Sequence, residues 1–155
     1  MRNKIFFLIF GVLTIGSALF IGRSYLRDFV FAQTKTTRVQ IKGTILQAEV
    51  MQTEAQREKG LSGRATLGMD KAMLFVYPKP TTPVFWMEGM RFPLDIIFIS
   101  KGKIIEVVKE AMPPMPEQVR KTYSPPASID WVLEVNAGLS DRQEWKVGDK
   151  VTLAP

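Results

Sequence analysis

An uncharged apolar stretch near the start of the chain restricts where the polypeptide can lie. Residues 5–22 carry no charge; two basic residues precede them, and Arg23 and Arg27 follow. About 18 residues of α-helix span roughly 27 Å, which is close to a hydrocarbon core of about 30 Å. We therefore expect residues 1–22 to form a membrane anchor with one transmembrane helix.

The alternative to an anchor is a cleaved signal peptide, whose apolar region is usually about 7–15 residues long. Val30-Phe31-Ala32 offers a cleavage site, although charged residues between 23 and 28 come first. Basic residues before the stretch favour an N-terminus on the cytoplasmic side. We expect a single-pass protein of the cytoplasmic membrane, held through residues 5–22, with its C-terminal domain extracytoplasmic, or a secreted domain if the segment is cleaved.

The rest of the chain has the composition of one folded domain. Hydrophobic residues make up 46% and charged residues 23% of the sequence, which is ordinary for a globular protein. Residues 23–37 are polar and predict a tether, so the domain should cover 38–155. The basic residues of this part are scattered and do not alternate with aromatics, so we expect no nucleic-acid partner.

The complete lack of His and Cys excludes several kinds of chemistry. Without them the chain cannot build a Ser-His-Asp triad, a Cys-His nucleophile, a thiol redox centre, a disulfide or a usual zinc site. No cofactor is predicted from the remaining residues.

Short apolar runs separated by Gly and Pro predict a mainly β domain. A capping box at residues 53–56 and a stop at Gly60 predict one short helix. Lys101-Gly102, between two apolar runs, predicts a hairpin, and the five prolines within 112–126 predict a loop. Strands are expected at 38–50 with a bend at Gly43, and at 73–77, 85–87, 94–99, 104–105, 128–135 and 145–153. Such spacing is typical of a sandwich or barrel.

Several of these segments together resemble a known family, the domain of unknown function 192, also called uncharacterised protein family 0127. The resemblance implies a compact, jelly-roll-like β sandwich or barrel with one or two short helices, often exported behind a signal or anchor. It implies no reaction. The matching segments are Gly60-Leu61-Ser62-Gly63-Arg64, Met73-Leu74-Phe75-Val76, Phe85-Trp86-Met87, Pro93-Leu94-Asp95-Ile96-Ile97-Phe98-Ile99, Tyr123, Val132-Leu133-Glu134-Val135-Asn136-Ala137-Gly138 and Gly148-Asp149.

The chain departs from the family pattern at two places. Glu88 and Gly89 follow the Trp-Met pair, where many members carry a basic residue and Asn. Met112 and Met115 occupy a stretch in which many members have a Cys. A cleft built around that Asn would differ here, and thiol-dependent roles cannot be carried over.

Two carboxylates and an arginine are candidates for binding or catalysis. Asp95 lies in an apolar strand, where an unpaired charge would be costly, so it needs a salt bridge to Arg64 or Arg91 or hydrogen bonds from loop amides. In the alternative, Asp95 and Glu134 share a cleft with Tyr123 and divide acid and base roles, as in glycosidases. Arg64 could grip a carboxylate or phosphate with its planar guanidinium, although its loop also has a purely structural explanation.

Aromatic and methionine residues supply further candidates. Trp86 could form a ligand platform beside Tyr123 and Asn136, or it could be a core residue. The candidate metal ligands are four methionines, Met87, Met90, Met112 and Met115, whose thioethers favour Cu(I). Methionine also commonly fills apolar gaps.

Three hypotheses of function follow. The first is a membrane-anchored extracytoplasmic binding domain, without a predicted enzyme activity, for a small polar or carbohydrate-like ligand or an envelope protein. The second is a carboxylate-based hydrolase of an envelope glycan that uses Asp95 and Glu134. The third is Cu(I) binding through methionines.

Overall fold

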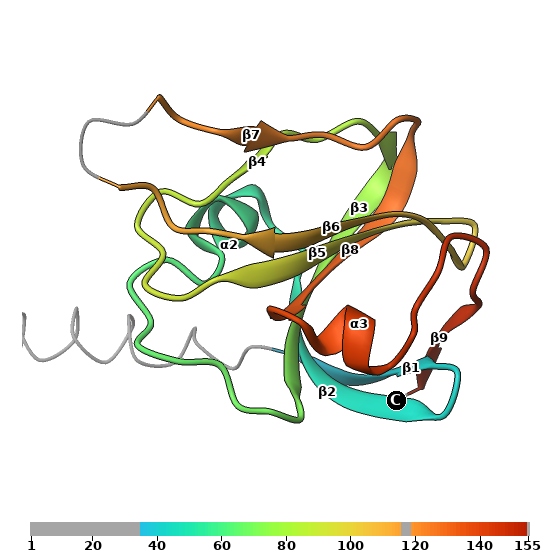
Figure 1. Cartoon of the computed structure of the whole chain (residues 1–155). Helices are drawn as coiled ribbons and strands as arrows, with labels where there is room; N and C mark the ends of the chain where they lie inside the picture. The colour runs from blue at the N-terminus through green and yellow to red at the C-terminus, as the bar shows by residue number, and fades with distance from the viewer. Residues whose placement is uncertain (1–34, 116–118, 155) are drawn as a thin grey trace, which may run out of the picture. The chain divides into compact units, whose positions relative to one another are not determined.

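The domain is a curled β-sheet with two short helices (Figure 1). The computed structural model describes residues 35–115 and 119–154. Seven strands form one half-barrel sheet in the order β6-β5-β8-β3-β2-β1-β9, and β4 and β7 form a separate ribbon. The strands are β1 (Thr36–Ile41), β2 (Thr44–Met51), β3 (Lys71–Thr81), β4 (Phe85–Trp86), β5 (Leu94–Ser100), β6 (Lys103–Ala111), β7 (Thr122–Tyr123), β8 (Ile129–Asn136) and β9 (Val151–Ala154), and the helices are α2 (Glu54–Lys59) and α3 (Leu139–Arg142).

The expected mainly β fold with one or two short helices is confirmed. Residues 38–50 form the antiparallel pair β1–β2, which turns at Lys42 and Gly43. Lys101 and Gly102 join β5 to β6 with positive φ angles of 50° and 68°, as a two-residue type I′ hairpin requires. The resemblance to the domain of unknown function 192 therefore predicted a β fold correctly. Of the two expected architectures, a sandwich or a barrel, the curled sheet is closer to a barrel.

Strand β3 continues past the point where its prolines were expected to end it. Pro78 and Pro80 lie between Val76 and Thr81, where the pairing with β8 shifts its register. A proline has no N–H group to donate, so it is tolerated where the ladder is interrupted. The strand therefore reaches Thr81 without losing a ladder hydrogen bond at either proline.

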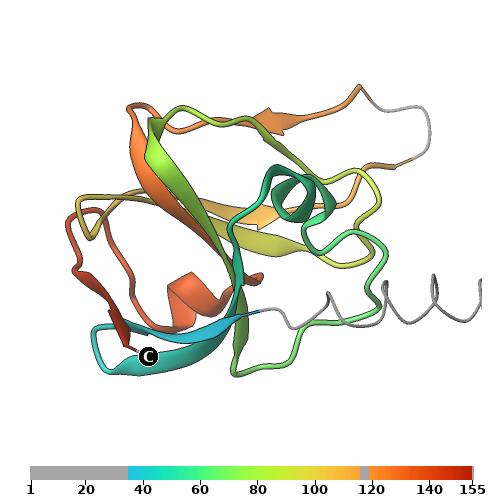
Figure 2. The same ribbon diagram turned by 180° about the vertical axis from the view of Figure 1, so that it is seen from behind.

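The sheet carries an apolar cluster on each face. Along β3, Leu74 belongs to one cluster, while Met73 and Phe75 belong to the other. The cluster that contains Leu74 also includes Leu139 of α3 and Trp145. The cluster that contains Phe75 also includes Leu61, which follows α2, and residues of the β4–β7 ribbon. Accordingly, α2 and the ribbon lie on one side of the sheet and α3 on the other (Figures 1 and 2).

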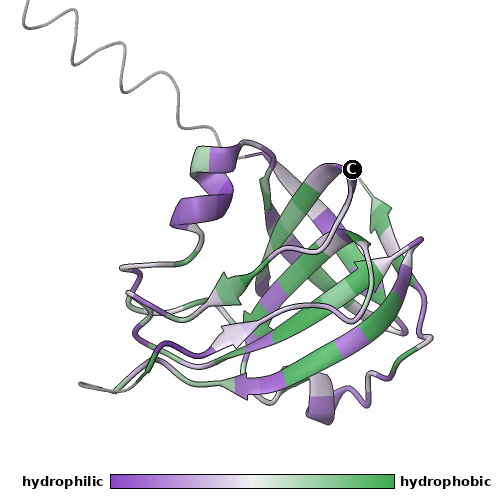
Figure 3. Ribbon diagram, turned by 90° about the horizontal axis from the view of Figure 1, so that it is seen from above, coloured by the Kyte–Doolittle hydropathy of each residue, from purple (hydrophilic) through white to green (hydrophobic). Residues whose placement is uncertain are grey.

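Colouring by hydropathy shows the same division (Figure 3). Strands of the sheet are largely apolar, whereas α2 is largely polar and has no buried residue. Strand β5, which lies between β6 and β8, is buried along six of its seven residues, which explains why all six except Asp95 are apolar. Helix α2 is therefore held at the surface by its ends and by a few contacts rather than by an apolar face.

The C-terminal segment is shorter in strand than expected. Strand β9 covers only residues 151–154, and the residues from 145 to 149 include a turn at Val147 and Gly148, close to the turn or bulge that Gly148-Asp149 predicts. Helix α3, which precedes them, was not expected at a definite place. A bridge between Lys103 and Lys150 connects the β6 edge to the residue before β9. This bridge brings the two edges of the curled sheet together at one end.

The expected membrane anchor at residues 1–22 lies outside the described residues, as does most of the tether expected at 23–37. The end of that tether was placed wrongly, because Thr36 and Thr37 already belong to β1. Among the helices that are described, none is long and apolar enough to cross a membrane. The described residues between 35 and 154 belong to one compact unit.

Candidate functional site

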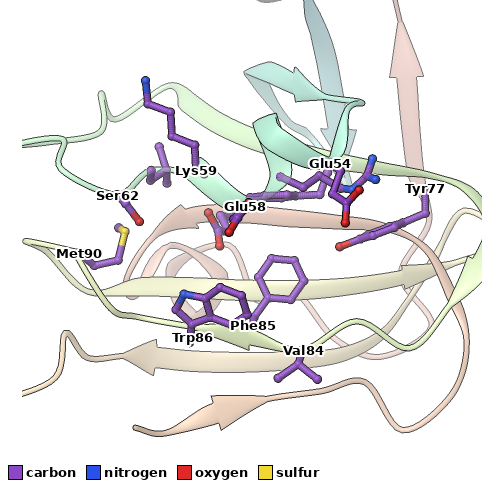
Figure 4. A pocket seen from close by; sticks show the side chains of 14 residues that line it. Glu54, Glu58, Lys59, Ser62, Tyr77, Val84, Phe85, Trp86 and Met90 are labelled. Carbon is purple, nitrogen blue, oxygen red and sulfur yellow. The ribbon is translucent and has the colours of Figure 1, made fainter.

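A pocket of about 340 Å³ lies between α2, the turn after it, and strands β3 and β4 (Figure 4). We call it the first pocket. Its walls are aromatic: Phe75, Tyr77, Phe85 and Trp86 line it together. Charged side chains of α2 form its rim, namely Glu54, Arg57, Glu58 and Lys59. The volume lies within the range of roughly 300–1,000 Å³ that is common for small-molecule sites.

Local sequence signals position the helix at this rim. Thr53 accepts a hydrogen bond from the Gln56 amide, and the Gln56 side chain accepts one from the Thr53 amide, which completes the predicted capping box. Gly60 ends the helix with φ 47°. A Cβ atom there would make an ordinary contact with the Phe75 ring at 3.5 Å, so it is the positive φ angle rather than a lack of space that favours glycine.

Glu134 is the buried carboxyl group of the first pocket. It lies on β8 between Met73 of β3 and Ile96 of β5, and its exposed fraction is 6%. No hydrogen bond or ion pair to Glu134 is found among residues 35–115 and 119–154. Burial alone raises the pKa of Glu134 from 4.5 to about 8, because no nearby cation offsets the loss of water around the charged form.

Tyr77 connects Glu134 to the charged rim. Its hydroxyl points toward the middle of the pocket (Figure 4). Burial raises the pKa of Tyr77 to about 12, and the Glu134 charge also raises it, while Arg57 acts in the opposite direction. The guanidinium of Arg57 lies 5.0 Å from the centre of the Tyr77 ring and donates hydrogen bonds to the carbonyls of Gln52 and Val76. Tyr77 therefore remains a protonated hydrogen-bond donor.

The aromatic wall is part buried and part open. Phe75 and Phe85 meet edge to face with their ring centres 5.1 Å apart. Trp86 is 39% exposed, and the Arg120 guanidinium lies 5.7 Å from its ring centre. Figure 4 shows the Trp86 and Phe85 rings side by side below α2. The exposed indole makes Trp86 available to a ligand, as the platform hypothesis requires.

Asp95 has a structural role in the opposite face of the sheet. It is fully buried and accepts hydrogen bonds from the amides of Glu110, Gly138 and Ser140 and from the Ser140 hydroxyl, at 2.7–3.1 Å. The expectation of hydrogen bonds from loop amides is confirmed. These bonds connect β5 to β6 and to the first turn of α3.

The proposed pair of catalytic carboxylates does not share a cleft. Asp95 pairs with Val135 across the β5–β8 ladder, and Ile96 pairs with Glu134. Because side chains of successive residues point to opposite faces of a sheet, Asp95 and Glu134 lie on different sides. The expected acid and base pair is therefore wrong as a joint site, and Glu134 alone faces the first pocket.

The other predicted site residues are divided among different places. Arg64 forms a two-bond ion pair with Glu49, at 2.5 and 2.7 Å, and this interaction lowers the pKa of Glu49. Asn136 donates to the carbonyls of Leu67 and Gly68 and so holds the loop before β3. Tyr123 lines another pocket. The expected grouping of Trp86 with Tyr123 and Asn136 is therefore not formed.

A second pocket, of about 460 Å³, contains three of the four candidate methionines. Met87, Met112 and Met115 line it with Tyr123, whereas Met90 lines the first pocket. Met87 is buried, while Met112 and Met115 are 62% and 63% exposed. Within the described residues, no group of three or more His, Cys, Asp or Glu could hold a metal ion.

Sequence reasoning missed three of the four aromatic residues around Glu134. Phe75 and Tyr77 are two residues apart in β3, and this spacing alone predicts that their side chains lie on the same face of the sheet. Placing that face under α2 required the parallel pairing of β2 and β3, which sequence periodicity does not reveal. Phe85 was not singled out, and it contributes to both the core and the pocket.

Comparisons with known proteins identify relatives without naming a ligand. Residues 36–153 match the model of the family DUF192, described as Uncharacterized ACR. One similar structure is a protein of unknown function from Novosphingobium aromaticivorans DSM 12444, with 30% identity, a TM-score of 0.71 and coverage of 79% of this chain and 88% of that one. Another is a proposed transcription regulator from Sinorhizobium meliloti 1021, with 28% identity, a TM-score of 0.70 and coverage of 77% and 95%. None of the curated proteins compared with the chain matches it.

Proposed function

Because this chain belongs to the DUF192 family, whose description gives no activity, we propose a function from its own residues: the domain binds a small polar ligand in the first pocket. The ligand would enter between α2 and Trp86 and place a polar group against Glu134. A ring-shaped molecule such as a sugar fits this description, because one flat face could lie on Trp86.

The observation that carries this proposal is the state of Glu134. A buried carboxyl group without a partner costs free energy, which a structural role would normally offset with hydrogen bonds. Asp95, on the neighbouring strand, has four such bonds, whereas Glu134 has none among the described residues. An arriving ligand would supply the missing partner.

Binding is favoured over hydrolysis by the position of the carboxylates. Glycosidases hold two carboxyl groups on either side of the bond to be broken. Here Asp95 lies on the other face of the sheet, fully buried and bonded to amides. Glu54 and Glu58 belong to the pocket rim, on the helix. A hydrolase would therefore need a different pair from the one expected.

A thermal-shift screen of the full chain against monosaccharides, amino sugars, amino acids and small amines tests the proposal. A ligand present at 100 times its Kd should stabilise the protein by about 2.7 kcal/mol. The shift should disappear in Trp86→Ala and weaken in Glu134→Gln, while Glu144→Gln and Met69→Ala, which alter exposed residues outside both pockets, should keep it. Equal shifts in Trp86→Ala and the unmodified chain would exclude the first pocket.

Cu(I) binding is a second candidate because three methionines line the second pocket. Cu(I) favours such soft ligands, and three methionines can hold it without His or Cys. A Cu(I) titration of the full chain against a chromophoric chelator should show one bound ion. The double variant Met112→Leu/Met115→Leu should lose it, and Met69→Leu should retain it. Retention by the double variant would exclude this site.

For its location we propose a single-pass membrane protein with residues 5–22 in the lipid and the β domain, in the jelly-roll-like form that the resemblance implies, outside the cytoplasm. An envelope protein could then meet the domain, and nucleic acid has no place in the proposal. Protease added to intact spheroplasts should degrade the domain if it is extracytoplasmic. A domain protected until the membrane is broken would contradict this location.

A further inference from the structure

The environment of Glu134 also indicates the chemical class of the ligand, an inference that rests on the proposed binding function. We infer that the first pocket receives a cationic nitrogen, a protonated amine or a quaternary ammonium group, which lies between the aromatic rings and the Glu134 carboxylate. Three observations support this assignment: the lack of a counterion, the ring composition of the wall, and the charges of the rim.

The counterion of Glu134 is missing although three arginines lie in this part of the domain. Arg57 is bonded to the carbonyls of Gln52 and Val76, and Arg64 is paired with Glu49. Arg120 is paired with Glu88 and lies over Trp86. None of these cations contributes to the pKa of Glu134, which is raised by burial alone. Once Glu134 loses its proton, a cation from outside the described chain would therefore be the counterion that these arginines do not provide.

The wall of the pocket suits a cation better than it suits an anion. Phe75, Tyr77, Phe85 and Trp86 present π-systems to the cavity, and the face of an aromatic ring attracts ammonium groups within about 6 Å. Two rings already hold protein cations, since Arg57 lies over Tyr77 and Arg120 over Trp86. The same attraction is available to a ligand on the inner side of the pocket.

The charged groups that face Glu134 leave the pocket acidic. Helix α2 contributes Glu54, Arg57 and Glu58, together with its last residue, Lys59. Tyr77 is the titratable residue contributed by β3, and β4 contributes apolar and aromatic side chains. Lys59 extends away from the rings in Figure 4. When Glu134 is ionised, the pocket is lined by three carboxylates and two cations, Arg57 and Lys59. The Glu134 carboxylate has no ion-pair partner among the described residues.

A cation and a neutral ligand would respond to pH in opposite ways. Glu134 holds a proton at pH 7, and a cation must displace it to gain the carboxylate, so binding should release close to one proton. For a group with a pKa of about 8, the affinity should rise about fiftyfold between pH 6 and pH 8. A neutral ligand that accepts a hydrogen bond from the protonated carboxyl group would bind more weakly above pH 8 and release no proton.

The test compares choline with its neutral isostere 3,3-dimethylbutan-1-ol, and butylamine with butanol, by calorimetry on the full chain. Heats measured in two buffers of different ionisation enthalpy give the number of protons released. We expect both cations to bind at least tenfold more tightly than their neutral counterparts, with affinity rising from pH 6 to pH 8. Glu134→Gln should remove the proton release and the pH dependence, and Glu144→Gln should keep both.

The outcomes separate this inference from the proposed function. Equal affinity for the cation and its isostere would overturn the cationic class while leaving a binding pocket. Failure of all four probes to bind would also overturn it, and the proposed function would fail only if the sugars and amino acids of the wider screen gave no shift either. Proton release that persists in Glu134→Gln would assign the titration to another group and reject the role of Glu134.

Discussion

The free energy of unfolding should fall as the pH rises from 5 to 8, because folding traps a proton on Glu134. Burial raises the pKa of this group from 4.5 to about 8, so the folded state holds a proton that the unfolded chain has released. Stability is then complete below the unfolded pKa and is lost as the pH rises toward the folded pKa. Each pH unit within that window costs about 1.4 kcal/mol.

The magnitude of the fall follows from these two pKa values. Near pH 5, ionisation of Glu134 stabilises the unfolded chain only slightly, because this pH is just above the pKa of 4.5. By pH 8, Glu134 begins to ionise in the folded state as well. The expected loss between pH 5 and pH 8 is about 3.5 kcal/mol, a large part of the roughly 5–15 kcal/mol that stabilises a typical domain. The window is favourable because the chain has no His and no Cys to titrate within it.

Urea denaturation of the full chain at pH 5, 6, 7 and 8, followed by tryptophan fluorescence, measures this slope. Glu134→Gln should flatten it and should be more stable than the unmodified chain at pH 8. Glu144→Gln is the matched control, because it removes an exposed carboxylate and should keep the original slope. A slope in Glu134→Gln equal to that of the unmodified chain would refute the reasoning. The carboxylates of Glu49, Asp70 and Asp149 have lowered pKa values, so their titration falls below this window.

Three substitutions test the framework around the site by the same denaturation assay. Asp95→Ala should cost about 3 kcal/mol or more, because it leaves the buried Ser140 amide and hydroxyl and other amides without an acceptor, and a loss below about 1 kcal/mol would contradict that role. Thr53→Ala should cost about 1 kcal/mol through loss of the helix cap, and an unchanged midpoint would show that the cap is dispensable. Gly60→Ala should cost about 1–2 kcal/mol because its φ is 47°, and it should also weaken ligand binding if the Phe75 ring shifts.

Local signals predicted the helix and the hairpin because their causes lie within a few residues. The capping box at Thr53 and the stop at Gly60 bound α2 as expected, and Lys101-Gly102 gave the β5–β6 turn. Strand β3 was cut short at Pro78 because the sequence does not show that the ladder is interrupted there. Helix α3 was missed because its first amides are held by Asp95, which is 45 residues away from Ser140 along the chain.

The candidate site was harder to predict because it depends on which face each residue occupies. Trp86 and Glu134 were both identified, but their grouping with Tyr123 and Asn136 was wrong. Phe85 pairs with Tyr123 and Trp86 with Thr122, so Trp86 and Tyr123 point to different sides of the β4–β7 ribbon and reach different pockets. A shift of one position in register changes the face of a side chain, and register between distant strands is not encoded in any short motif.

Asp95 and Glu134 show how two similar carboxyl groups in adjacent strands can acquire different roles. Their backbones lie next to each other in the β5–β8 ladder, yet the alternation of side chains sends one toward α3 and the other toward the first pocket. Asp95 meets the amides at the start of a helix, which stabilise a negative charge, and its four hydrogen bonds make it part of the scaffold. Glu134 meets aromatic rings, whose faces attract a positive charge, and it has no hydrogen bond or ion pair among the described residues. The surroundings of Glu134 therefore favour a cation that the described chain does not provide, and this is why we assign the site to a ligand rather than to the fold.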